Sequence, residues 1–149
     1  MSAERQAAIR AAEKLLRVGK LPAPVEAYTR LVDEQPGDLD TALLLAQLHL
    51  RSKNVDAAAG RFASIADAWR LEGKLEQAFD TYKKILSIRP VDEHALGHAA
   101  ALAITQGQTA EGRKYLLVLA DQQVARNDMA AAGDTLAEAA TLDPSDAAM

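Results

Sequence analysis

Two histidines four residues apart come closest to a chemical site in this sequence. His94 and His98 fall on a predicted helix, where residues four apart share one face. Two imidazoles placed in this way could bind one transition-metal ion, but such a site needs further ligands, and no His-Glu-x-x-His motif is present. The sequence therefore favours one exposed or capping histidine and one packed at a helix contact, and it predicts no metal site.

Other catalytic arrangements are also missing from the sequence. There is no cysteine, no Gly-x-Ser-x-Gly motif and no glycine-rich phosphate loop. Carboxylate pairs such as Asp33-Glu34 and Asp92-Glu93 fall at predicted helix ends, where they would cap a helix or offset its dipole. We therefore expect a protein that is not an enzyme and has no cofactor. A metal-dependent enzyme centred on the two histidines is the third alternative.

Three basic residues form a stripe on the first predicted helix. Arg10, Lys14 and Arg17 recur at intervals of four and three residues, with Glu13 beside them. Such a stripe is typical of a solvent-exposed helix face, and it could also dock an acidic peptide. The formal net charge is −4 and the sequence pI about 5.4, so the overall charge argues against nucleic acid as a partner.

The elements that position these side chains are predicted to be helices. Hydrophobic residues make up 49% of the chain and aromatic residues only 4%, so Ala and Leu, two strong helix formers, carry the apolar content. No stretch alternates between apolar and polar residues as a half-buried strand would. Apolar runs such as 115–120 are too short to span a bilayer, and the first residues lack the apolar core of a signal peptide. We expect a cytoplasmic protein without membrane insertion.

The chain contains an internal repeat. Segments 19–28 and 73–82 both begin with Gly-Lys-Leu and end with Tyr, and each is followed by a proline and then an aspartate. A third copy begins at Asn127, and weaker copies begin at residues 53 and 107. The five starts are spaced alternately by 34 and 20 residues, so the sequence repeats with a 54-residue period. Each Gly or Asn is expected to end a helix in a left-handed conformation.

The repeat resembles the tetratricopeptide repeat (TPR), a family of stacked helix pairs. The first-helix pattern of that family fits Phe62-x₂-Ile65-Ala66-x₂-Trp69, which is followed by residues of the second helix, Gly73, Ala78, Tyr82 and Pro90. The resemblance runs from about residue 5 to 146 and implies an all-α, right-handed superhelix, with Trp69 in the core. It also implies a single repeat domain, residues 1–149, with units at about 5–38, 39–92 and 93–146.

The 20-residue steps depart from the family, because one helix must end one motif and begin the next. We therefore expect about eight antiparallel helices in a 54-residue, three-helix super-repeat. The predicted helices cover residues 3–18, 22–35, 38–52, 54–72, 74–88, 91–106, 108–126 and 128–142.

The resemblance implies a scaffold that binds a protein or peptide partner on its concave helical surface. Leu43, Gln47, Leu50 and Arg51 are spaced for one helical face and are the predicted groove residues. The Lys, Asn and Arg clamp with which family members grip chaperone tails is missing at the matching positions, which carry Ile9, Glu13 and Leu44. The arrangement is similar to the amino-terminal repeat segment of larger bacterial proteins.

Self-association is the second alternative. Stacks of repeats could join through the apolar faces of their terminal helices, and the stretch 129–132 near the end of the chain is apolar. No capping helix is predicted after Pro144, although solenoid ends usually need a polar cap. A homo-oligomer is therefore an expected form of the protein under this alternative.

Overall fold

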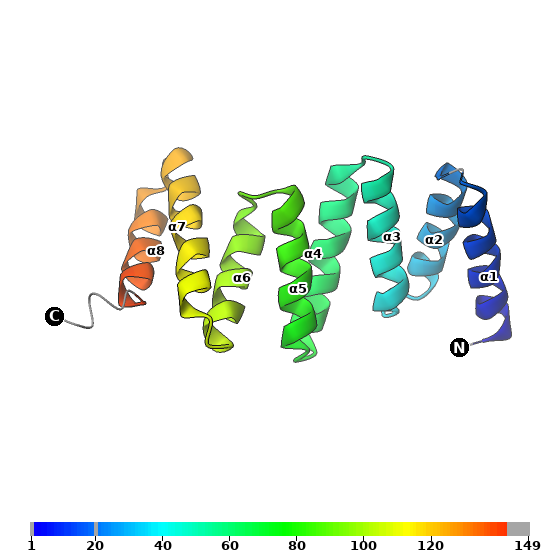
Figure 1. Cartoon of the computed structure of the whole chain (residues 1–149), viewed down its shortest axis with the longest axis horizontal. Helices are drawn as coiled ribbons and strands as arrows, with labels where there is room; N and C mark the ends of the chain where they lie inside the picture. Colours follow the sequence, from blue (N-terminus) through cyan, green and yellow to red (C-terminus); the bar gives the residue numbers. More distant parts are fainter. Residues whose placement is uncertain (1, 20, 143–149) are drawn as a thin grey trace. The chain divides into compact units, whose positions relative to one another are not determined.

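The computed structural model places eight helices, and no strand, in the residues that it describes, 2–19 and 21–142 (Figure 1). The helices are α1 (Ala3–Val18), α2 (Pro22–Glu34), α3 (Leu39–Arg51), α4 (Val55–Leu71), α5 (Leu75–Ile88), α6 (Glu93–Thr105), α7 (Thr109–Ala125) and α8 (Met129–Thr141). Every boundary lies within two residues of the predicted one. The all-α class and the predicted number of helices are confirmed for this part of the chain.

The chain divides into two units, residues 1–65 and 66–149, and each is described by itself. In the first unit, α2 packs against both α1 and α3. In the second unit, α6 packs against α5 and α7, and α7 packs against α8. The division falls within α4. The prediction of one repeat domain with three units stays a prediction.

The turns between helices use the residues that the repeat singled out. All five predicted repeat starts have a positive φ: Gly19 (86°), Lys53 (63°), Gly73 (81°), Gly107 (81°) and Asn127 (68°). Glycine and asparagine adopt this left-handed conformation readily, and it ends a helix because the next backbone N–H groups then bond to the last helix carbonyls. Lys53 adopts it despite its Cβ atom, so the repeat geometry holds even where the residue type does not favour it.

The 54-residue period appears directly in the helix starts. α3, α4 and α5 begin at residues 39, 55 and 75, and α6, α7 and α8 begin 54 residues later, at 93, 109 and 129. By the same register, α1 and α2 correspond to α4 and α5. We call α1–α2 the first copy, α3–α5 the second and α6–α8 the third, and residues one period apart are called equivalent.

Small residues mark the contacts between helices. The position five residues after a repeat start is buried in each later copy, as Ala58, Ala78 and Ala132, and as Gly112 in α7. A Cβ atom on Gly112 would lie 2.7 Å from Cγ1 of Ile104, so α6 and α7 approach too closely there for a larger residue. Trp69 is buried, as predicted.

A buried ion pair ties α1 to the start of α3 in the first unit. The Arg5 guanidinium donates to the backbone carbonyl of Leu31 at 2.9 Å and to the Asp38 carboxylate at 2.7 Å. Asp38 is also the N-cap of α3 and accepts from the Thr41 backbone N–H and hydroxyl. Burial alone would raise the pKa of Asp38, but the hydrogen bonds from Arg5 and Thr41 outweigh it and lower the pKa.

Within the described residues, no helix combines the length and apolar character that crossing a bilayer requires.

Candidate functional site

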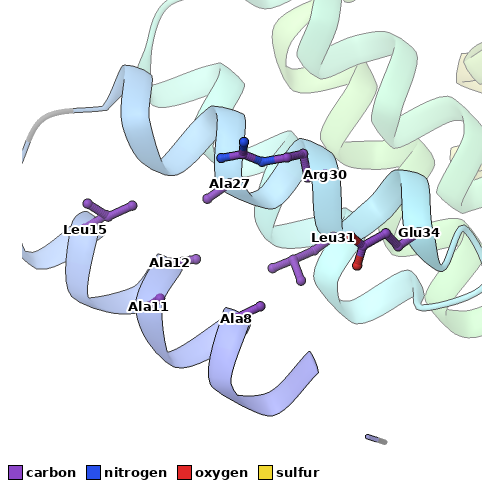
Figure 2. Close-up of a pocket in the computed structure, with 8 residues that line it drawn as sticks. All are labelled: Ala8, Ala11, Ala12, Leu15, Ala27, Arg30, Leu31 and Glu34. Carbon is purple, nitrogen blue, oxygen red and sulfur yellow. The ribbon is translucent and has the colours of Figure 1, made fainter. Parts of the chain in front are cut away.

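An open groove lies between the first two helices of the first unit, and we call it the α1–α2 groove (Figure 2). It encloses about 260 Å³ and is lined by Ala8, Ala11, Ala12, Leu15, Ala27, Arg30, Leu31 and Glu34. Leu31 is buried, whereas Leu15 is 39% exposed. Arg30 and Glu34 are more exposed and add charge to a wall that is otherwise apolar. The groove is therefore apolar inside, with one charge of each sign on α2.

The third copy shows what fills the equivalent groove. Leu116, Ala120 and Ala139 are equivalent, two periods on, to Ala8, Ala12 and Leu31 of the α1–α2 groove. All three are buried in the third copy, whereas in the first copy Ala12 and Leu31 are buried and Ala8 is exposed. Leu116 and Ala139 form one apolar cluster with Ala100, and Ile104 of α6 packs against that cluster. A helix, α6, thus covers the surface that is open in the first copy.

A second, smaller hollow of about 80 Å³ lies among α1, α2 and α3 in the first unit. Its lining residues are Leu16, Tyr28, Leu44, Gln47, Leu48 and Arg51. Two of the four predicted groove residues, Gln47 and Arg51, therefore lie together there. Leu43 and Leu50 are half-buried and are not among the lining residues. At 100° per residue they lie on a neighbouring face of α3. Partner binding by these four residues stays a prediction.

The basic stripe lies on the solvent-exposed surface of α1. Arg10, Lys14 and Arg17 are all exposed, and they lie on the side of α1 that points away from the α1–α2 groove. None of the three forms an ion pair within the part of the chain that the structure describes. Their use as a docking stripe also stays a prediction.

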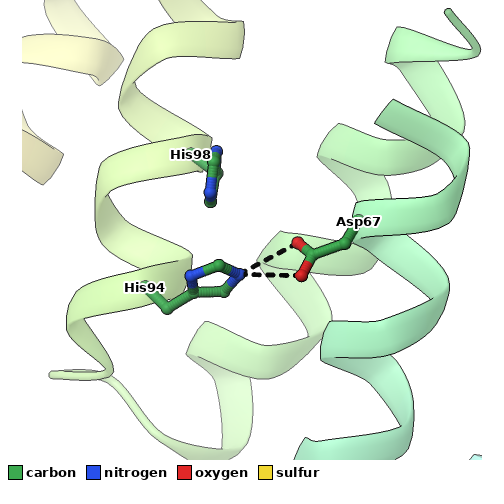
Figure 3. A group of neighbouring side chains, drawn as sticks. All are labelled: Asp67, His94 and His98. Carbon is green, nitrogen blue, oxygen red and sulfur yellow. Dashed lines mark hydrogen bonds and ion pairs between the residues drawn. The ribbon is translucent and has the colours of Figure 1, made fainter. Parts of the chain in front are cut away.

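The second unit brings the two histidines together with a carboxylate from another helix (Figure 3). Asp67 lies on α4, and His94 and His98 lie one turn apart on α6. The Nε2 atom of His94 is 2.9 and 3.1 Å from the two carboxylate oxygens of Asp67. One nitrogen of each histidine and one oxygen of Asp67 lie within 4.8 Å of one another. We call these residues the Asp67–His94–His98 cluster.

Tyr82 and Arg70 support this cluster from α5 and α4. The buried Tyr82 hydroxyl donates to the Asp67 carboxylate and accepts from Nε of Arg70 at 3.2 Å. The His98 ring stacks on the Tyr82 ring with centroids 5.1 Å apart. The His94 ring meets the His98 ring edge-on at 4.5 Å. The cluster therefore belongs to a network in which aromatic rings hold both imidazoles in place.

Burial and charge set the protonation of the network. Burial would raise the pKa of Asp67, but hydrogen bonds from Tyr82 and His94 outweigh it and lower the pKa. Burial and the hydrogen bond to Asp67 raise the pKa of Tyr82 to about 12. Burial and then the positive charge of Arg70 lower the pKa of His98. At neutral pH the site therefore holds a carboxylate, a neutral phenol and a neutral His98 imidazole.

Comparison with known proteins supplies only distant similarities. No family model and no curated protein matches the chain. Among solved structures, it is similar to a MamA RS-1 ArsTM double mutant, with a TM-score of 0.43 and 11% identity over 98% of each chain. It is also similar to a thermophilic TPR protein of Thermus thermophilus, with a TM-score of 0.35 and 18% identity over 94% of this chain and 92% of that one. The fold is TPR-like, and that assignment rests on the chain's own helix order and repeat register.

Sequence reasoning missed two parts of this TPR-like structure. It did not identify the α1–α2 groove, although Ala8 and Ala11 stand out against the bulkier Phe62 and Ile65 at the equivalent positions of the second copy. It also did not join Asp67 to the histidines. The signal available for that was the repeat alignment, which places Asp67 opposite Asp121 and so marks it as a repeat position.

Proposed function

We propose that the protein is a non-catalytic interaction module that binds a helix of a partner protein in the α1–α2 groove. The observation that carries the proposal is the contrast between copies: the equivalent groove of the third copy is filled by α6, whereas the first is open among the described residues. An apolar groove between two helices is a common receptor for an amphipathic helix. The partner helix should present small and apolar residues on one face, as α6 does with Ala100 and Ile104.

The residues of the groove suit a partner that binds reversibly. Alanines replace bulky core residues along α1: Ala8 and Ala11 are equivalent to Phe62 and Ile65 of α4. Because alanine buries little apolar surface, leaving it exposed to water carries a small free-energy penalty. The open groove therefore tolerates solvent, while a docked helix would still gain close contact with the α1 backbone. Arg30 and Glu34 would pair with charges on the polar edge of that helix.

A second copy of this chain is a less suitable occupant. In α8, Met129 and Leu136 are 57% and 47% exposed, so this helix does present an apolar face. That face is equivalent to the side of α5 on which α6 packs, since Leu136 is equivalent to Tyr82. The α1–α2 groove and the α8 face thus both fit a helix of the α6 type and do not complement each other. We expect light scattering to show a monomer, and a concentration-dependent dimer would favour self-association.

Selection from a library of helical peptides tests the proposal even while the natural partner is unidentified. Peptides enriched on the intact protein should carry small and apolar residues at intervals of three and four. Their affinity should fall by tenfold or more, which is about 1.4 kcal/mol, in a protein carrying Ala8→Arg and Ala11→Arg. Arginine is a good helix former, so these changes should leave α1 folded.

The matched control is Ala7→Arg, which places the same side chain on an exposed position of α1 outside the groove lining. The selected peptides should bind this variant as tightly as the unmodified protein. Equal loss of affinity in the control and in the groove variant would show that added charge, and not the groove, controls binding. Unchanged affinity in the groove variant would refute the proposed site.

A further inference from the structure

We propose that Asp67, His94 and His98 form a binding site for one divalent transition-metal ion of the Zn²⁺ class. Two imidazole nitrogens and one carboxylate oxygen would hold the ion, and water would complete the coordination. The site belongs to the second unit and is independent of the groove on which the proposed function rests.

The positions of the ligand atoms carry the first step of the argument. Zn–N and Zn–O bonds of about 2.0–2.2 Å place tetrahedral ligand atoms roughly 3.4 Å apart. The His94 nitrogen is already 2.9 Å from an Asp67 oxygen, and all three ligand atoms lie within 4.8 Å of one another. Binding of one ion would draw these atoms together from within 4.8 Å to that spacing. Figure 3 shows the His94 ring pointing toward Asp67 and the His98 ring one turn along α6 on the side of that helix that faces α4.

The types of ligand carry the second step. Imidazole nitrogen suits Zn²⁺, Ni²⁺, Cu²⁺ and Fe²⁺, whereas Mg²⁺ and Ca²⁺ prefer sites made of oxygen alone. Metal-binding carboxylates are usually hydrogen-bonded in turn, which fixes their orientation. Here the Tyr82 hydroxyl donates to Asp67, and the Tyr82 ring stacks on His98. The surrounding shell therefore holds two of the three ligands in place.

The internal repeat shows that the fold does not need these residues. One period earlier, the positions of Asp67, His94 and His98 are occupied by Glu13, Asp40 and Leu44. Tyr82 is matched by Tyr28, which is also buried and whose pKa is raised by burial and by the Glu13 carboxylate. The tyrosine and its acidic neighbour thus occur both in the cluster and at the equivalent positions one period earlier. The histidines occur only in the cluster. The same backbone positions fold with a leucine in place of His98.

Arg70 is the feature of the site that opposes a cation. Its guanidinium donates to Tyr82, and its charge acts on His98. The equivalent residue in the first copy is Leu16. If a metal ion binds here, removing the guanidinium charge should tighten the binding severalfold, because two positive charges no longer face each other. A purely structural hydrogen-bond network gives no reason for Arg70→Leu to increase metal affinity.

Calorimetric titration of the full chain with ZnCl₂ tests the site. The unmodified protein should bind one equivalent and show a higher melting temperature with Zn²⁺ present. His98→Leu, which installs the residue of the preceding copy, should abolish both effects. Tyr82→Phe keeps the ring and removes the hydroxyl, so it should weaken binding by roughly tenfold. Arg70→Leu should strengthen it.

The control is His49→Ala, which removes the one histidine outside the cluster and should leave the titration unchanged. Loss of binding in this control, or retention in His98→Leu, would show that Zn²⁺ binds elsewhere and would overturn the proposal. Absence of any binding to the unmodified protein would do the same. If His98→Leu lost its helical circular dichroism, Asp67→Asn would decide, because it keeps the side-chain shape and removes the charged ligand.

Discussion

The Arg5–Asp38 ion pair allows a sharp test of how the first unit is held together. The Arg5 side chain is 3% exposed and the Asp38 side chain 19%, so the pair is largely withdrawn from water. Asp38→Ala would remove the N-cap of α3 and leave the Arg5 charge buried with only the Leu31 carbonyl as acceptor. Loss of an N-cap costs about 1 kcal/mol, and breaking a buried ion pair about 3–5 kcal/mol. Because Asp38 keeps some solvent contact, we expect the loss of the pair to lie near its lower end, which with the lost cap makes a total of about 4 kcal/mol.

The repeat provides a matched control for this substitution. Asp92 is equivalent to Asp38 and caps α6 by accepting from the Ala95 backbone N–H at 2.9 Å. The residue equivalent to Arg5 is Ala59, which has no charge to pair. Asp92→Ala should therefore lose only the cap and cost about 1 kcal/mol. The difference of about 3 kcal/mol between the two variants is the predicted cost of leaving the buried arginine without its partner.

Urea denaturation followed by circular dichroism would measure both losses, and a double-mutant cycle would separate them. Arg5→Met combined with Asp38→Ala should show a coupling energy of at least about 1 kcal/mol, because each single change removes the same pair. The same Arg5→Met change should be additive with Asp92→Ala. Equal losses for the two aspartate variants, or no coupling in the cycle, would refute the assignment of this pair as a stabilising contact.

Three further predictions concern two glycines, the effect of acid pH, and the predicted groove face of α3. Gly112→Ala should destabilise the protein by about 1–3 kcal/mol, because its Cβ would overlap an α6 side chain. Gly133→Ala meets open space in α8 and should stabilise the protein by about 0.5–1 kcal/mol. Thermal melts would measure both changes. Because the pKa of Asp38 is lowered in the folded state, its carboxylate adds stability that is fully present above the unfolded pKa of about 3.9 and is lost as pH falls through the folded pKa. The melting temperature should therefore fall less on acidification in Asp38→Asn than in the unmodified protein. Replacing Leu50 and Arg51 together by alanine should leave both peptide capture and the helical circular dichroism unchanged, because neither residue lines the α1–α2 groove. Loss of capture with the fold intact would instead assign binding to the predicted groove face of α3.

The helix order could be predicted because its signals are local. A glycine or asparagine at a repeat start fixes the end of a helix through its own backbone conformation, and a capping aspartate fixes the start of the next. Asp38 and Asp92, the aspartates that follow the repeat prolines, are both N-caps, and each accepts a backbone hydrogen bond three residues on. Such effects depend on a few neighbouring residues, so the sequence alone was enough to place the boundaries.

The face that each helix presents was harder to predict. α3 reads Leu-Asp-Thr-Ala-Leu-Leu-Leu-Ala-Gln-Leu-His-Leu-Arg, with apolar residues around most of its circumference. The pattern therefore does not define which face of α3 is buried, and packing against the neighbouring helices sets the rotation of α3 about its axis. In the smaller hollow Leu44 and Leu48 lie beside Gln47 and Arg51, while Leu43 and Leu50 lie on the neighbouring face of α3, and which face binds a partner stays a prediction.

Contacts between residues far apart in the sequence were not predictable from spacing. Asp67 and His94 lie 27 residues apart and on helices that are separated by α5. Arg5 and Asp38 are 33 residues apart. Neither pair follows from helical periodicity, because each depends on how the helices pack in three dimensions. The histidine spacing placed the two imidazoles on one face, and only the fold brought the Asp67 carboxylate beside them.

The most direct test of the account is to map where a selected helical peptide binds the full chain by NMR. We expect the amide resonances of the α1–α2 groove residues to move most, with smaller shifts at the basic stripe on the opposite side of α1. Peptide-induced shifts confined to α3 or α8, with the groove residues unmoved, would contradict the central claim that the open groove of the first copy receives a partner helix.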